Sequence, residues 1–365
     1  MQWFVAPLLL MIITTAASVN EGRAADSNEK KTTANALEWD ENLIKETSAN
    51  LRKEMKNFFA EENFTSKIRV KVSGKFIIVH DVSDGYAEWL AALLGEVGKA
   101  FDKFVDRIGL QVLELEKPMT VFVFASREEF DAYATKLRGP AYREQANKPT
   151  GFYNQKLNRS IIYDRTGVEE NLPDPMKYVN VDYKFTRKKI NEHAREIKRR
   201  DNADSNTSTI VHEATHQLCY NYAIFSTDFR APDWLVEGVA MTFEQTSQDA
   251  PLGWRFRNYF PVNYGRLNQF REYAKSHPGC EILDEILVSD DFAVRLDDAG
   301  YAASWAMFYY CYRKRPKELA KYMAVIAQKK PFTKYEREER LQDFVDAFGE
   351  IQEFGLEFAK FIRSL

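Results

Sequence analysis

The sequence predicts an α+β fold in which a mixed region of strands and helices is followed by a mainly helical region. Strand-like segments are confined to residues 67–163, where helical patterns separate them. From residue 209 onward, apolar residues recur mainly at helical spacing. The chain has 365 residues, of which 45% are hydrophobic and 14% aromatic, enough for a substantial core.

Residues 1–25 are expected to be a secretory signal peptide. Residues 4–17 are apolar but too short for a comfortable membrane span, and small residues follow them. No Lys or Arg precedes the apolar run, so an uncleaved N-terminal anchor is the alternative. No later stretch is long and apolar enough to span a membrane. We therefore expect a secreted, periplasmic or cell-envelope protein without an integral span after signal removal.

Residues 26–66 are expected to form a helical N-terminal extension that is either a packing helix or a spacer. This stretch is polar at first, then charged, with apolar residues at helical spacing. The main domain is expected to follow over residues 67–365.

Strand patterns in the first part of that domain predict a small sheet. The expected strands are residues 67–72, 75–80, 119–124, 151–153 and 160–163. Helices are expected over residues 86–110 and 127–137. Gly74 indicates a hairpin turn between the first two strands, and residues 156–158 indicate a turn between the last two. Ser126 and Glu129 form a capping box before the second helix.

Residues 164–208 are expected to be an insertion. Residues 164–182 are turn-rich, and residues 186–200 predict a helix with an excess of basic side chains. That helix is either a solvated surface element or an element beside a cleft that attracts anionic substrates. Residues 201–208 predict a polar loop, with Ser208 as the N-cap of the next helix.

After residue 244 the chain is expected to be helical throughout. The main helical segments are expected at residues 301–311, 319–327, 341–348 and 354–362, with a further apolar segment at 282–287.

An H-E-x-x-H run at residues 212–216 carries the clearest chemical signal. His212 and His216 are four residues apart, so on a helix their imidazoles share a face and can reach one metal ion. Glu213 lies about 100° around the helix from His212. There it could take a proton from a metal-bound water rather than bind the metal. Only 5 histidines occur in the chain, and the alternative is that these two are ordinary core or surface residues.

Glu237 is the candidate third metal ligand, since a catalytic zinc site needs three protein ligands and one open position. Pro232 and Asp233 predict the start of the apolar helix that carries it. A carboxylate on such a helix is costly to bury unless it is paired or metal-bound. Asp233 and Glu244 are the alternatives for this role. Zn²⁺ is the expected ion, although two imidazoles and one carboxylate also suit other divalent ions.

At these residues the sequence resembles the gluzincin zinc metallopeptidases, and in particular the peptidase-MA-like group, many of whose bacterial members are exported proteins of unassigned function. The gluzincin pattern is H-E-x-x-H followed by W-L-x-E-G-x-A on a second helix. Residues 212–216 and 234–240 match it position for position. The resemblance is strong over residues 205–245 and looser over roughly residues 75–325.

One departure from the family concerns support for the histidine ligands. Some gluzincins carry an acidic residue four positions past the third ligand, and here that position is Met241. Glu244 or a backbone carbonyl could give this support instead.

The resemblance implies a gluzincin-like fold with a cleft between two lobes. The upper lobe would be residues 67–208, including the insertion, and the helical lower lobe residues 209–365. An edge strand of the upper sheet would pair with an extended peptide in the cleft. The resemblance also suggests that Tyr301 donates its hydroxyl to the oxyanion formed during amide hydrolysis. Core packing is the alternative role for Tyr301.

The remaining histidines are expected to be structural or exposed. His80, His193 and His277 have no partner at ligand spacing. A disulfide between Cys280 and Cys311 would be compatible with export, but an odd number of cysteines leaves at least one free. Cys219 is expected to lie in the core.

Two classes of function follow. The first is a zinc-dependent peptide hydrolase acting on a peptide or protein, with Glu213 as general base and then acid. The second is a secreted binding protein that keeps the zinc fold without turnover. The intact Glu213 favours the enzyme, because a structural site has no use for a proton acceptor and is more often closed by a fourth ligand. The net charge of −3 gives no indication of nucleic-acid binding.

Overall fold

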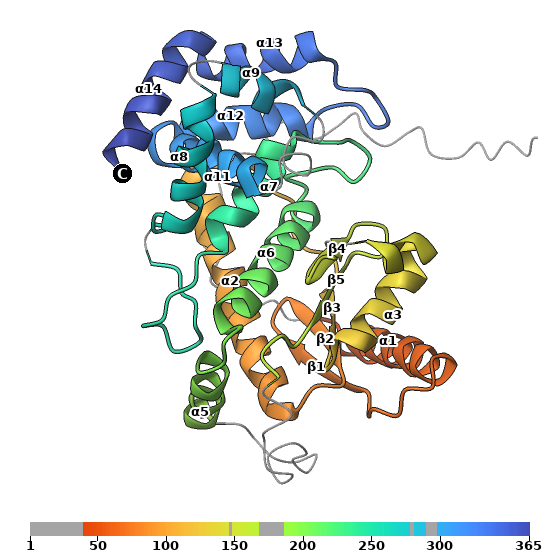
Figure 1. Ribbon diagram of the computed structural model, residues 1–365. Helices are drawn as coiled ribbons and strands as arrows, with labels where there is room; N and C mark the ends of the chain where they lie inside the picture. Colours follow the sequence, from red (N-terminus) through yellow and green to blue (C-terminus); the bar gives the residue numbers. More distant parts are fainter. Residues whose placement is uncertain (1–38, 146–147, 168–185, 258, 278–280, 290–297) are drawn as a thin grey trace, which may run out of the picture. The chain divides into compact units, whose positions relative to one another are not determined.

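A mixed five-stranded β-sheet is formed within the described part of the chain in the computed structural model (Figure 1). The described residues are 39–145, 148–167, 186–257, 259–277, 281–289 and 298–365. The strands are β1 (Arg69–Ser73), β2 (Phe76–His80), β3 (Met119–Phe124), β4 (Gly151–Asn154) and β5 (Arg159–Tyr163). Their order is β1-β2-β3-β5-β4, with β2, β3 and β5 parallel and the two edge strands antiparallel to their neighbours. The expected signal peptide and Cys280 lie outside the described residues.

Helices cover both faces of this sheet. They are α1 (Glu41–Glu61), α2 (Asp84–Ile108) and α3 (Arg127–Arg138). Side chains alternate along β2, so that Phe76 and Ile78 share a core with α2, whereas Ile77 and Val79 share a second core with α1 and α3. All of β2 is buried, as expected for a strand covered on both sides. The described helix of the N-terminal extension therefore packs against the sheet.

Helix α2 joins the sheet to the helical part of the fold. It starts at the N-cap Ser83 and ends at Gly109, whose positive φ of 75° suits a glycine at a helix C-terminus. Near its end, the ring of Phe104 contacts the rings of Phe243 and Phe308. One continuous core therefore runs from the sheet into the helices that follow.

The later helices include the two that carry the H-E-x-x-H run and Glu237. They are α5 (Arg187–Lys198), α6 (Ala203–Asn221), α7 (Asp233–Phe243), α8 (Tyr264–Ser276), α9 (Glu281–Val288), α11 (Asp298–Lys314), α12 (Pro316–Ala327), α13 (Arg337–Phe348) and α14 (Ile351–Ser364). Helix α7 packs on α6 and α11. Gly238 permits the close approach to α11, because a Cβ there would lie 2.5 Å from Cβ of Phe308 and 2.6 Å from the carbonyl oxygen of Ser304.

The basic helix α5 buries one face and exposes much of its charge. His193, Ala194 and Ile197 are buried, and the helix packs on α2 and α6. Residues 187–189 are exposed. Arg199 pairs with Glu196 within the helical segment.

The predicted start of the H-E-x-x-H helix is wrong. Helix α6 begins at Ala203, with Asn202 at its N-cap position, so Ser208 lies inside the helix and residues 203–208 are not a loop. The polar residues of this stretch suggested a loop because such side chains favour caps and turns. Here tertiary contacts decide instead, since Asn206 is buried and its Nδ2 donates to the hydroxyl of Tyr86 at 3.0 Å.

The expectation of helix throughout the chain after residue 244 is also wrong. Residues 245–257 and 259–263 contain no helix. Gly253, with φ of 81°, lies in a turn in which its carbonyl accepts the Ser247 amide. The indole of Trp254 donates to the carbonyl of Phe243 at 2.6 Å and fixes this segment to the end of α7.

Most element predictions are confirmed within a few residues. β3 has the predicted bounds, Gly74 makes the predicted turn with φ of 54°, and Ser126 and Glu129 form the predicted capping box. Within the described residues, no helix combines the length and apolar character needed to cross a bilayer.

Candidate metal centre

Helix α6 presents His212 and His216 together because its opposite side is held in the core. Ile210, Val211, Ala214 and Leu218 are buried, which fixes the rotation of the helix about its axis. The two imidazole rings lie edge to face with centroids 4.6 Å apart. Their Nε2 atoms are 3.0 Å apart.

A second buried contact fixes the end of α6 to the sheet. The amide of Gln217 donates to the carbonyls of Thr120 and Asn158 at 3.0 and 2.9 Å. Its Oε1 accepts the hydroxyl of Ser160 at 2.9 Å. The histidines therefore lie on a stretch of helix that is anchored at Asn206 on one side and Gln217 on the other.

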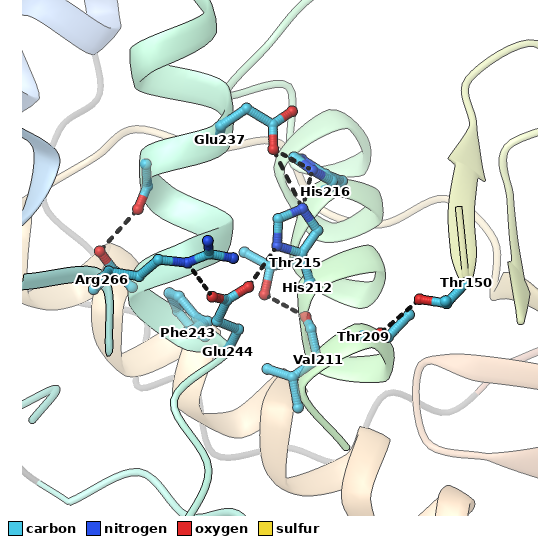
Figure 2. A network of polar contacts seen from close by, with 12 residues as sticks. Thr150, Thr209, Val211, His212, Thr215, His216, Glu237, Phe243, Glu244 and Arg266 are labelled. Atoms are coloured by element: carbon cyan, nitrogen blue, oxygen red, sulfur yellow. Dashed lines mark hydrogen bonds and ion pairs between the residues drawn. The ribbon is translucent and has the colours of Figure 1, made fainter. Parts of the chain in front are cut away.

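Helix α7 brings Glu237 to the two histidines, as Figure 2 shows. Its Oε2 lies 3.3 Å from Nε2 of His212 and 3.6 Å from Nε2 of His216. One ligand atom from each of the three residues falls within 4.8 Å of the others. This group could hold a metal ion.

Glu244 contacts the far side of the His212 ring. Its Oε2 lies 3.0 Å from Nδ1 of His212, and its Oε1 accepts Nε–H of Arg266 at 3.2 Å (Figure 2). A carboxylate at Nδ1 favours the tautomer with the proton on that nitrogen, which leaves the lone pair of Nε2 directed at the common point. Glu244 is thus a supporting residue and not the third member of the cluster.

The electrostatics of the group favour positive charge at the common point. Burial alone would lower the pKa of His212, but hydrogen bonds to Glu237 and Glu244 and the charge of Glu213 raise that pKa well above its ordinary value. Burial alone would raise the pKa of Glu237, but the neighbouring His216 and His212 hold it well below its ordinary value. A proton or a divalent cation can supply the charge that these carboxylates stabilise.

The donor set fits a divalent transition metal such as zinc. Two imidazole nitrogens and one carboxylate oxygen match the ligand types of a catalytic zinc site. Nδ1 of His216 is buried without a hydrogen-bond partner among the described residues. The close approach of the two Nε2 atoms at 3.0 Å needs a shared proton or a shared cation, since two lone pairs repel.

Glu213 takes no part in the cluster of three. No hydrogen bond or ion pair to its carboxylate occurs among the described residues, and only its backbone carbonyl accepts a bond, from Ser160 at 3.3 Å. Its charge nevertheless acts on His212. A carboxylate that is near the centre but unused in structural contacts can accept a proton there.

Comparison with known proteins adds one match. Residues 206–333 match the family described as "Protein of unknown function (DUF1570)". This segment includes His212, His216 and Glu237, together with Glu244 and Arg266. No curated protein matches the chain.

The other residues considered from the sequence lie outside the group of three. Asp233 forms an ion pair with Arg230 at 3.5 Å. Tyr301 packs against the core from α11, and the guanidinium of Arg266 lies 5.9 Å from its ring centroid. The role of the Tyr301 hydroxyl as a donor to an oxyanion stays a prediction. Cys219 and Cys311 are buried free thiols, as expected for Cys219 in the core.

The histidines outside the motif have structural surroundings. Nδ1 of His80 is buried 3.1 Å from the carbonyl of Val82, and His193 packs against Gly85. The ring of His277 stacks on Tyr273. Arg266 was missed by sequence reasoning, because its contact with Glu244 depends on how α8 and α7 both pack on α11, and no local motif signals it.

Proposed function

We propose that the protein is an exported zinc-dependent peptide hydrolase of gluzincin type. The observation that carries the proposal is the convergence of His212, His216 and Glu237, with Glu213 beside them and unpaired among the described residues. A closed structural zinc site would normally have a fourth protein ligand. Within the described residues, no fourth His, Cys, Asp or Glu joins this cluster.

The three ligand side chains would hold the ion in a set orientation. Glu244 fixes the ring of His212, and Arg266 in turn fixes Glu244. When bound, zinc would supply a water of lowered pKa and polarise the substrate carbonyl.

Glu213 would move the proton. Its carboxylate would accept a proton from the attacking water and pass it to the nitrogen of the leaving amine, acting first as base and then as acid.

The sheet edge beside α6 supports a peptide as substrate. Among the described strands, β4 pairs only with β5, and α6 packs against it. The hydroxyls of Thr150 and Thr209 lie 3.2 Å apart where β4 meets the helix, as Figure 2 shows. In the gluzincin-like arrangement that we propose, an extended peptide would pair with this edge and pass the metal centre.

The test compares wild-type protein with Glu213→Gln after zinc loading. We expect the wild type to cleave casein or members of a peptide library. We expect the variant to bind zinc normally but to lose at least about a hundredfold in kcat, the usual range for a general base. Glu338→Gln, on the exposed first turn of α13, is the control for loss of a carboxylate.

Two results would overturn the proposal. One is a zinc-loaded wild type that cleaves no peptide, which would leave a non-catalytic binding protein. The other is cleavage that persists unchanged in Glu213→Gln. Recovery of the mature protein from the cell envelope or medium tests export separately.

A further inference from the structure

A polar groove lies beside the candidate metal centre. It has a volume of about 400 Å³, within the usual range of small-ligand sites. Its lining residues are Asp204, Ser205, Ser208, Glu244, Gln245, Thr246, Asn263, Gly265, Arg266, Gln269 and Asp298. None has an aliphatic or aromatic side chain. A polar substituent would find many hydrogen-bonding groups here.

The groove adjoins the candidate metal centre through two elements. Glu244 lines the groove and also contacts Nδ1 of His212, so the groove begins one imidazole ring away from the converging ligand atoms. Ser205 and Ser208 precede His212 by seven and four residues on α6, which places all three on one face of the helix. A substrate bound at the metal can therefore extend along this face into the groove.

The charges of the lining favour a cation. Three carboxylates and one guanidinium line the groove, and Arg266 already pairs with two of the three, with Nε 3.2 Å from Glu244 and a terminal nitrogen 3.3 Å from Asp298. After this pairing a negative charge excess remains.

Two carboxylates are accessible to a ligand. The side chain of Asp298 is 74% exposed. Asp204 is contacted by the neutral amide of Gln248, with both oxygens accepting at 2.6 and 2.7 Å. Neither contact cancels the negative charge of Asp204. The hydroxyl of Ser208 has no hydrogen-bond partner among the described residues and can serve as a further acceptor.

We propose that this groove is the substrate subsite for a lysine or arginine side chain of the peptide, held by Asp204 and Asp298. The proposal rests on the peptide hydrolase function and names its substrate class. A long basic side chain would place its charged end between these carboxylates, while its peptide backbone stays at the metal centre. Arg266 would attract a carboxylate of the substrate only weakly, because Glu244 and Asp298 already engage it.

The first experiment measures binding without turnover. Zinc-loaded Glu213→Gln is titrated calorimetrically with three capped pentapeptides of alanine that carry lysine, leucine or glutamate at the central position. We expect the lysine peptide to bind about tenfold more tightly than the other two. Asp204→Asn and Asp298→Asn in that background should each weaken it by about two- to fivefold, as for exposed ion pairs. Asp346→Asn, on α13, is the matched control.

The outcomes separate the two proposals. Equal or undetectable binding of the three peptides, or a lysine preference that survives the double substitution of Asp204 and Asp298, overturns the subsite. Cleavage by the wild type without preference for basic residues also overturns it and leaves the hydrolase standing. A lysine preference that depends on both aspartates, in a protein whose wild type cleaves nothing, supports the subsite and rejects the hydrolase.

Discussion

The carboxylate of Glu244 lies 3.0 Å from Nδ1 of His212, although it follows Glu237 by seven residues and not four. The four-residue position is Met241, which is buried in the core. Glu244 is the C-cap residue of α7 and is still helical, so it lies about two turns beyond Glu237 on a similar face. Support for the histidine thus comes from the end of the helix that carries the third ligand.

Glu244→Gln should weaken zinc binding by about 10- to 100-fold, the usual effect of losing a carboxylate that orients a histidine ligand. The amide oxygen can still accept a hydrogen bond from Nδ1–H but no longer carries the charge. Competition with a chromogenic chelator measures the dissociation constant. Glu272→Gln, on the exposed face of α8, is the control. An unchanged constant in Glu244→Gln would remove Glu244 from the centre.

Zinc should stabilise the wild type against heat. A ligand that binds only the folded state at about 100 times its dissociation constant contributes about 2.7 kcal/mol. We expect a chelator to lower Tm by several degrees and added zinc to restore it. Glu237→Gln, which weakens a ligand and keeps its shape, should make Tm largely independent of zinc. If this variant responds as the wild type does, the ion binds elsewhere.

Gly238→Ala should destabilise the fold by about 1–3 kcal/mol, because the new Cβ would overlap Phe308 and the carbonyl of Ser304 on α11. Gly95→Ala is a matched control, since Gly95 is also helical but a Cβ there meets nothing within 4 Å. That control should be stabilising by up to about 1 kcal/mol from helix propensity. Urea unfolding gives the free energy of unfolding of both variants. Equal changes in Gly238→Ala and Gly95→Ala would contradict the tight contact of α7 and α11.

The free energy of unfolding should fall in acid because His80 is protonated more readily in the unfolded chain than in the folded protein. Burial, with a further effect of Arg69, lowers its pKa to about 3. Below pH 6.5 the unfolded chain takes up a proton at this position that the folded protein does not. The contribution of neutral, buried His80 to the free energy of unfolding is therefore complete above pH 6.5. It is lost as the pH falls toward 3.

A comparison of the wild type with His80→Gln isolates this effect. The difference in their free energies of unfolding should change by about 1.4 kcal/mol per pH unit below 6, in favour of the variant. Between pH 7 and 8 the difference should be constant. A difference that does not change between pH 6 and 4 would show that His80 is accessible to protons in the folded protein.

Local patterns in the sequence predicted much of the fold. β3, the capping box at Ser126 and the turn at Gly74 depend on neighbouring residues, and all three agree with the structure. The pairing of His212 with His216 follows from helical spacing alone. The position of Glu237 was also foreseen, because a carboxylate on an apolar helix needs a partner.

The features that the sequence did not reveal depend on contacts between distant residues. The start of α6 is set by Asn206 bonding to Tyr86, 120 residues away. The role of Arg266 and the lining of the groove arise from the packing of α11 on α7 and of α8 on α11. Whether Glu244 or a backbone carbonyl supports His212 could not be decided from spacing, since both fit the pattern.

The anchoring of α6 at Asn206 and Gln217 bears on how fast an ion could enter or leave. Both imidazoles lie between these fixed points, so their backbone would stay in place during exchange. The carboxylate of Glu237 is the member that comes from another helix, and rotation of its side chain alone would open the coordination. Capture and release would then require a rotamer change of one side chain and no rearrangement of the fold.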